Sequence, residues 1–235
     1  MTISPLARLR RDVYQANLAL AASGLVLGTF GNVSGVDRQR GWVAIKPSGV
    51  PYDQLTAGRI AVVDLATGRA VAGDLRPSSD LPTHLELYRA WPSVGGVVHT
   101  HSLYATAWAQ AGRPIPALGT THADHFFGAV PCTRPLRPAE IRADYERNTG
   151  RVIVERLAGV DPLDMPAALV ASHGPFAWGQ TAAFAVENAI LLEYIAALAT
   201  ETLTIRPGAR PISAALLNKH FRRKHGPNAT YGQKR

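Results

Sequence analysis

The sequence predicts a layered protein of the α/β or α+β class. Three observations support this class: apolar residues that recur at helical spacing, short apolar runs typical of strands, and an interleaved order of the two along the chain. The 235 residues fit one ordinary domain. Because no repeat, low-complexity segment or linker divides the chain, we expect a single domain spanning residues 1–235.

Helices are expected first at about 5–23, with Gly24 as the C-terminal cap, and then from a start at Ser79 or Asp80. Ser102 is expected to cap a third helix that runs to about Gln110. Later helices are expected near 138–158, 181–200 and 212–224. After a Gly/Asn/Ser loop at 28–35, strands are expected at 42–46, 60–64, 94–101, 128–133 and 168–172.

The formal net charge of +8 is confined to the C-terminal part of the chain. Residues 1–201 hold 17 Lys/Arg and 17 Asp/Glu, whereas residues 202–235 hold eight Lys/Arg and no acidic residue. This distribution indicates neither a spread basic face nor a base-reading helix, so we expect no nucleic-acid partner. The basic excess fits a solvated helix, or a patch that attracts anionic substrates.

The cysteine content and the apolar segments bear on where the protein works. Cys132 is the single cysteine, which excludes an intrachain disulfide, and we expect it to be a buried small residue. The most apolar stretch, 182–199, contains Glu187, Asn188 and Glu193, which we interpret as too polar for a membrane span. We therefore expect a cytoplasmic protein without a membrane partner.

The strongest local signal for chemistry is His99-Thr100-His101, which ends an apolar run. Side chains two apart on a strand point to the same side, so both imidazoles can reach one metal ion. His173 follows a second apolar run, and Asp80 beside a helix start could add an oxygen ligand. Three imidazoles and a carboxylate suit zinc or a similar divalent ion. The alternative is a pair of strand histidines that are hydrogen-bonded within a polar rim.

Three small-polar clusters, at 31–34, 46–49 and 77–80, are rich in Gly, Ser, Asn and Pro. Such segments expose backbone N–H groups and hydroxyls that can bind phosphate, although each alone also fits an ordinary turn. The chain has neither G-x-x-x-x-G-K-[ST] nor G-x-G-x-x-G, so the nucleotide-binding motifs receive no support.

In their order and spacing these motifs resemble the L-ribulose-5-phosphate 4-epimerase family. The resemblance covers about residues 12–233. It is carried by Gly31-Asn-Val-Ser, Ile45-Lys-Pro-Ser-Gly, Pro77-Ser-Ser-Asp, Val98-His-Thr-His-Ser, Gly119-Thr-Thr-His-Ala-Asp, Ser172-His-Gly-Pro-Phe and Tyr231-Gly-Gln.

The resemblance implies a three-layer αβα fold of the class II aldolase type, with a central, largely antiparallel sheet. It also implies a homotetramer with active sites between subunits, a small phosphorylated ketopentose as substrate, and one divalent metal per subunit. Zn²⁺ is favoured, with Mn²⁺ or Co²⁺ as alternatives. The basic tail 226–235 would then be ordered by a neighbouring subunit.

The resemblance also implies a role for particular residues. The implied metal ligands are Asp80, His99, His101 and His173. The implied phosphate pocket comprises Asn32, Ser48, Gly49, Ser78 and Ser79, with Lys46 beside it. The implied acid/base pair, supplied by the neighbouring subunit, is Asp124 and Tyr231.

The chemistry of epimerisation accounts for these residue types. In a 2-ketose 5-phosphate the C4 hydrogen is not adjacent to the carbonyl, so simple enolisation cannot invert C4. The C4 hydroxyl is β to the ketone, which allows the C3–C4 bond to break by a retro-aldol reaction. A metal can stabilise the resulting enediolate charge, and one proton-transfer group is needed on each face of the aldehyde.

Two other functions stay open. A fuculose-phosphate type aldolase would keep the three histidines but carry glutamate in place of Asp80, and a noncatalytic module like the adducin head domain would share the fold. The chain has four lysines, none in an apolar run, which disfavours a Schiff-base aldolase. His125 stands where close relatives of the epimerase are expected to have tyrosine.

Overall fold

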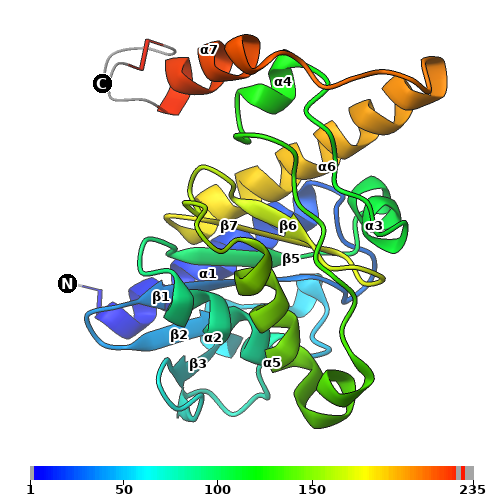
Figure 1. The fold of residues 1–235 in the computed structure, drawn as a ribbon. Helices are drawn as coiled ribbons and strands as arrows, with labels where there is room; N and C mark the ends of the chain where they lie inside the picture. Colours follow the sequence, from blue (N-terminus) through cyan, green and yellow to red (C-terminus); the bar gives the residue numbers. More distant parts are fainter. Residues whose placement is uncertain (1–2, 226–228, 231–235) are drawn as a thin grey trace.

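The computed structural model describes residues 3–225 and 229–230, and its centre is a seven-stranded sheet (Figure 1). The strand order is β4-β3-β2-β1-β5-β7-β6, and each neighbouring pair is antiparallel. The strands are β1 (Asn32–Asp37), β2 (Trp42–Ile45), β3 (Ala61–Asp64), β4 (Ala70–Ala72), β5 (Gly96–His99), β6 (Ala167–Leu169) and β7 (Pro175–Gly179). The predicted central antiparallel sheet is thereby confirmed.

Helices cover both faces of this sheet. They are α1 (Pro5–Ala22), α2 (Leu81–Ala90), α3 (Leu103–Gln110), α4 (Thr120–Ala123), α5 (Pro138–Arg156), α6 (Ala182–Ile205) and α7 (Ala214–His225). Two 3₁₀ turns, Tyr52–Gln54 and Ala57–Arg59, precede β3.

Two adjacent residues of β1 show which helices lie on which face. The backbone of Val33 is bonded to the side chain of Asn17 from α1, whereas the Ser34 hydroxyl meets Tyr88 from α2. Successive strand residues face opposite sides of a sheet, so α1 and α2 lie on opposite faces. Helix α6 packs beside α1, and α5 packs on α2, which confirms the three-layer αβα arrangement (Figure 1).

Helix α6 packs closely on β5 and β7 because the strand positions beneath it are glycines. A Cβ atom built on Gly96 would lie 2.4 Å from the backbone of Ala182, and one on Gly179 would lie 2.8 Å from Phe184. By length and composition α6 is the one helix of the described residues that could cross a membrane. Core helices pass the same test, so it does not decide between a span and the prediction that 182–199 is too polar for one. However, α6 contacts the sheet along β5 and β7, as a core helix does.

Several predicted elements differ from the structure. Part of the expected loop 28–35 belongs to β1, where Ser34 and Gly35 pair with β5 in spite of their low strand propensity. The strand expected at 128–133 is absent, since Val130 and Cys132 make only isolated bridges. Cys132 is buried, as predicted.

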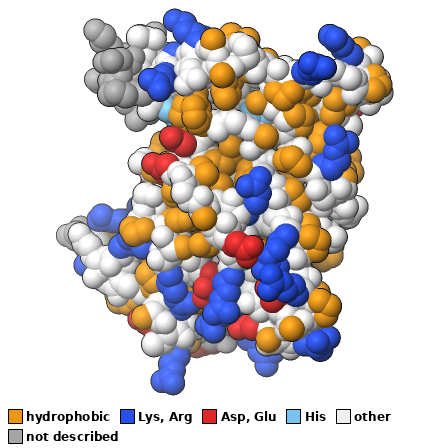
Figure 2. Space-filling model, viewed as in Figure 1, with side chains coloured by type: hydrophobic (Ala, Val, Ile, Leu, Met, Phe, Trp, Pro, Cys, Tyr) orange, Lys and Arg blue, Asp and Glu red, His pale blue; other side chains and the backbone are white. Residues whose placement is uncertain are grey.

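The face shown in Figure 2 carries interleaved positive and negative side chains over α2 and α5. Glu86 of α2 pairs with Arg89, Arg147 and Arg151. On this face, basic side chains are therefore accompanied by acidic ones. Helices α4 and α7 pack on each other and stand off one end of the body, beyond the strands (Figure 1).

Candidate metal centre and phosphate pocket

His99 and His101 come together at the end of the central strand β5. His99 is the last residue of β5, and its Nε2 lies 3.1 Å from Nε2 of His101. The other ring nitrogen of His99, Nδ1, lies 2.9 Å from the carbonyl oxygen of Pro175. A carbonyl can only accept, so Nδ1 carries the proton and Nε2 keeps its lone pair. The ring of Phe176 stacks on His99 at 4.2 Å and fixes its plane.

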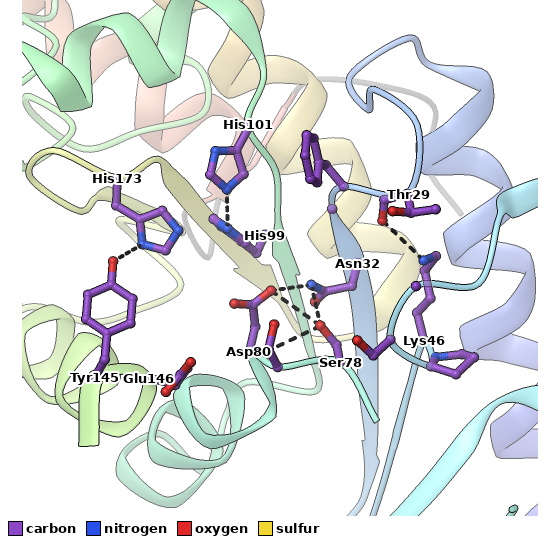
Figure 3. A pocket seen from close by; sticks show the side chains of 16 residues that line it. Thr29, Asn32, Lys46, Ser78, Asp80, His99, His101, Tyr145, Glu146 and His173 are labelled. Atoms are coloured by element: carbon purple, nitrogen blue, oxygen red, sulfur yellow. Dashed lines mark hydrogen bonds between the residues drawn. The ribbon is translucent and has the colours of Figure 1, made fainter. Parts of the chain in front are cut away.

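His173 reaches the same place from the tight turn between β6 and β7. The turn is closed by the bond from the Val170 amide to the Gly174 carbonyl, and Ser172 within it has a positive φ of 61°. Such a conformation costs energy in a non-glycine residue and often accompanies a functional constraint. The Ser172 amide is held by the Ala109 carbonyl of α3. The turn therefore presents His173 to the end of β5 (Figure 3).

Ligand atoms of His99, His101 and His173 all lie within 4.8 Å of one another. Burial lowers the pKa of His99, and burial together with the other two imidazoles lowers the pKa of His173 to about 4. Both rings are therefore neutral at pH 7, the form in which imidazole binds a metal. Two nitrogens bound tetrahedrally to zinc are separated by roughly 3.3 Å, which fits the spacing between His99 and His101. The three residues thus fit a divalent ion.

Asp80 lies in the same pocket but is not one of this closely spaced group. It is the N-cap of α2, at the predicted start of this helix, but its carboxylate makes no cap bond. Instead, Oδ2 of Asp80 accepts from Nδ2 of Asn32 at 2.7 Å (Figure 3). Burial opposes its ionisation, but the nearby imidazoles and Asn32 outweigh burial and lower the pKa of Asp80.

The predicted phosphate-binding residues line the same cavity, whose volume is about 410 Å³. They are Asn32, Lys46, Ser48, Gly49, Ser78 and Ser79. Lys46 is buried, donates to the Thr29 carbonyl at 3.3 Å and lies 4.7 Å from the ring centre of Tyr52. Burial lowers the pKa of Lys46. Within the described residues its ammonium has no carboxylate partner, so a bound anion would be favoured there.

Asn32 links the two halves of the pocket. Its Nδ2 donates to both Asp80 and Ser78, while its Oδ1 is buried and makes no hydrogen bond within the described residues. Since an amide oxygen only accepts, this atom suits a substrate hydroxyl better than a phosphate. Asn32 thus contacts both Asp80, a predicted metal ligand, and Ser78, a predicted phosphate-binding residue.

Four pocket residues lie outside the motifs of the sequence analysis: Thr29, Phe30, Tyr145 and Glu146. Tyr145 and Glu146 follow Asp144, whose non-helical φ of −161° and ψ of 83° kink α5. The Asp144 carboxylate accepts from the Arg147 amide at 3.2 Å, as an N-cap does. This cap within a helical segment was the available signal, but it does not reveal which pocket the next residues face.

The predicted acid/base residues do not line this pocket within the described chain. Asp124 ends α4, and its carboxylate accepts hydrogen bonds from His220 and Arg223 of α7. Burial opposes its ionisation, but these bonds outweigh burial and lower the pKa of Asp124. Tyr231 lies outside the described residues. The assignment of both residues therefore stays a prediction.

The chain is thus an αβα domain in which three imidazoles that could hold a metal ion lie in one pocket with a buried lysine. The family model for "Class II Aldolase and Adducin N-terminal domain" matches residues 11–200. The chain belongs to this family.

Solved structures with this fold include an L-fuculose 1-phosphate aldolase, with 23% identity, a TM-score of 0.76, and coverage of 93% of this chain and 95% of that chain. YgbL from Klebsiella pneumoniae, whose description names aldolase, epimerase and decarboxylase as candidate activities, has 29% identity, a TM-score of 0.72, and coverage of 92% and 99%. L-fuculose 1-phosphate aldolase from Glaciozyma antarctica PI12 has 19% identity, a TM-score of 0.75, and coverage of 98% and 88%.

Proposed function

We propose that the chain is a metal-dependent L-ribulose-5-phosphate 4-epimerase that interconverts L-ribulose 5-phosphate and D-xylulose 5-phosphate. The observation that carries the proposal is the convergence of His99, His101 and His173 on the wall of a cavity that also holds Lys46. A noncatalytic module has no need for three convergent imidazoles beside a buried cation. Retention of this set therefore favours an enzyme over an adducin-like interaction domain.

In the proposed reaction, the C4 hydroxyl of the substrate loses its proton and the C3–C4 bond breaks. The products are the enediolate of dihydroxyacetone and glycolaldehyde phosphate. A divalent ion held by the three imidazoles would stabilise the negative charge on the enediolate oxygens. Lys46 and the hydroxyls of Ser48 and Ser78 would hold the phosphate while the aldehyde turns over.

Recombination then requires proton transfer on the other face of the aldehyde. The enediolate carbon attacks that face, and the new C4 oxygen takes up a proton, so that the atoms balance and only C4 is inverted. We assign the two proton carriers to Asp124 and Tyr231 of a neighbouring subunit, because Asp124 does not line the pocket of its own chain. The lowered pKa of Asp124 keeps its carboxylate ionised, the form in which it would begin as the base.

A shared site requires an oligomer, for which we propose a homotetramer. Several large apolar side chains on the outer side of α6 are exposed, namely Ile190, Tyr194, Leu198 and Ile205. The first three recur at i, i+4 and i+8, which places them on one stripe of the helix. Such a stripe on α6 suits a contact between copies of the chain.

The second candidate is a sugar-phosphate aldolase of the fuculose-phosphate type. It is favoured by Glu146, whose side chain lines the pocket close to Asp80 and could replace the acid/base glutamate of that class (Figure 3). In that reaction the phosphate stays with the ketone fragment, whereas in the epimerase it stays with the aldehyde. The two functions therefore predict opposite orientations of the substrate between Lys46 and the histidines.

The direct test incubates the metal-loaded protein with L-ribulose 5-phosphate and, separately, with L-fuculose 1-phosphate. We expect D-xylulose 5-phosphate from the first and no release of dihydroxyacetone phosphate from the second. Release of dihydroxyacetone phosphate without epimerisation would establish the aldolase in its place. Inactivity with both sugars in a protein that binds metal would reject both assignments.

Subunit sharing has its own test. A Tyr231→Phe variant and a His99→Ala variant, each inactive alone, should regain partial activity when mixed under conditions that exchange subunits. If labelled subunits exchange and no activity returns, the acid/base pair does not come from a neighbour.

A further inference from the structure

Tyr145 makes a hydrogen bond to one of the three clustered histidines. Its Oη lies 3.2 Å from Nδ1 of His173, and the two ring centres are 5.9 Å apart (Figure 3). The sequence analysis assigned Tyr145 no role, and nothing in the mechanism above uses it. It is nevertheless the side chain whose hydroxyl lies at Nδ1 of His173, the ring nitrogen that would face away from an ion bound at Nε2.

The backbone around Tyr145 is fixed from two sides. The Asp144 cap starts a new helical turn at Tyr145, and the Thr149 hydroxyl donates to the Tyr145 carbonyl at 2.9 Å. The Thr83 hydroxyl of α2 donates to the carbonyl of Glu146, the next residue. Helix α2 begins directly after Asp80, which also lines the pocket. These bonds therefore tie Tyr145 to the helix that starts at Asp80.

Hydrogen-bond chemistry gives this contact a direction. A neutral imidazole has one protonated nitrogen and one lone-pair nitrogen. If Nε2 of His173 binds the metal, Nδ1 carries the proton and donates to Oη of Tyr145. The Pro175 carbonyl imposes the same tautomer on His99. Tyr145 thus does for His173 what a backbone carbonyl does for His99. His101, which is exposed, has no comparable partner for its Nδ1 among the described residues.

We propose that Tyr145 is a positioning residue of the metal centre. Its hydroxyl accepts the Nδ1 proton of His173, fixes the tautomer and the ring angle, and holds Nε2 toward the metal. Partners of this kind commonly change metal affinity by 10- to 100-fold. The inference rests on the three-histidine metal site of the proposed function, but not on the identity of the sugar.

The test compares Tyr145→Phe with the wild type and with Tyr14→Phe, a matched control in which a partly buried tyrosine of α1, outside the pocket, loses the same hydroxyl. Zn²⁺ affinity is measured by competition with a chromophoric chelator. We expect Tyr145→Phe to weaken Zn²⁺ binding by about 10-fold or more, with Tyr14→Phe equal to the wild type. Equal affinity in all three proteins would overturn the inference.

A second readout does not depend on the variant folding well. Long-range ¹H–¹⁵N spectra of the metal-free wild type report which ring nitrogen of each histidine carries the proton. We expect Nδ1–H for both His99 and His173. In Tyr145→Phe the His173 signal should shift toward a mixture of tautomers, while His99, held by Pro175, should not change. His173 with its proton on Nε2 in the wild type would contradict the proposal.

These outcomes separate the two claims. A wild type that binds no divalent ion would contradict the proposed metal site itself. If the wild type and Tyr145→Phe bind the ion equally tightly, the metal site stands and only the role of Tyr145 is contradicted.

Discussion

Both carboxylate oxygens of Asp124 accept hydrogen bonds from Arg223, at 3.1 Å to Nε and 2.9 Å to Nη2. The two residues are far apart in the chain, and their contact joins α4 to α7. His220 adds a third bond to the same carboxylate at 3.0 Å. Whatever its part in proton transfer, Asp124 therefore anchors the helix that leads to the C-terminal tail.

Asp124→Ala should loosen α7 without unfolding the sheet. We expect faster amide hydrogen exchange in residues 214–225, because the bonds from His220 and Arg223 to the Asp124 carboxylate are lost, although the bond of His225 to the Asp124 carbonyl remains. Exchange of β5 should stay as in the wild type. Asp12→Ala, at an exposed carboxylate, serves as the control. Unchanged exchange in α7 would show that this anchor is dispensable.

Glu193 should contribute strongly to stability, although it lies in an apolar helix. Its carboxylate accepts from the Ser102 hydroxyl and from the amides of Tyr104 and Ala105, so it caps α3 directly after the metal-binding strand end. Glu193→Gln turns an acceptor into a donor against these groups. We expect a loss of at least about 2 kcal/mol in urea unfolding. The exposed Glu187→Gln should change stability by less than about 0.5 kcal/mol, and equal effects would refute the capping role.

His84 should make the stability of the metal-free protein depend on pH. It is fully buried and bonded to Ser34, and burial lowers its pKa to about 3. Between the ordinary pKa near 6.5 and this value, only the unfolded chain takes up the proton. The unfolding free energy therefore falls as the pH falls through this window.

Comparison with His84→Gln isolates this effect. The variant should be less stable than the wild type at pH 7, and the difference should shrink by about 2 kcal/mol on going to pH 5. Urea unfolding in the presence of a chelator measures it. A difference that stays constant between the two pH values would show that His84 does not resist protonation in the folded state.

Residue periodicity predicted a layered class, and the short motifs with the family resemblance predicted that His99, His101 and His173 come together. His99 and His101 share a strand end, and a spacing of two residues fixes their common side. The strand β1 was missed because Asn32, Ser34 and Gly35 have low strand propensity, and the burial of these residues between two sheet neighbours overrides it. Ser102 is the N-cap of α3, as predicted, but its side chain makes no bond to the first turn. Its hydroxyl binds Glu193 from a distant helix, and such a contact leaves no local pattern.

Tyr145 and Glu146 could not be assigned for a related reason. Their approach to the pocket depends on the kink at Asp144 and on the docking of α5 against α2, where Gly150 lies too close to Glu86 and the Thr83 carbonyl to carry a side chain. Helix docking of this kind is a tertiary property. Sequence periodicity alone predicts a continuous helix.

Asp80→Glu should separate epimerisation from cleavage. The added methylene moves the carboxylate away from Nδ2 of Asn32, which now holds it at 2.7 Å. We expect slower epimerisation of L-ribulose 5-phosphate and a larger share of released glycolaldehyde phosphate, measured by trapping the aldehyde. If Asp80→Glu leaves the rates of epimerisation and of glycolaldehyde phosphate release unchanged, the position of this carboxylate is unimportant for the reaction.

The central claim is that His99, His101 and His173 hold one divalent metal ion. The most direct measurement titrates the chelator-treated protein with Zn²⁺ by calorimetry, beside His101→Gln, whose exposed ring can be replaced with little disturbance of the core. The account predicts one equivalent of zinc per wild-type chain, and binding at least about 100-fold weaker in a variant whose circular dichroism is unchanged. No binding by the folded wild type, or equal binding by both proteins, would contradict it.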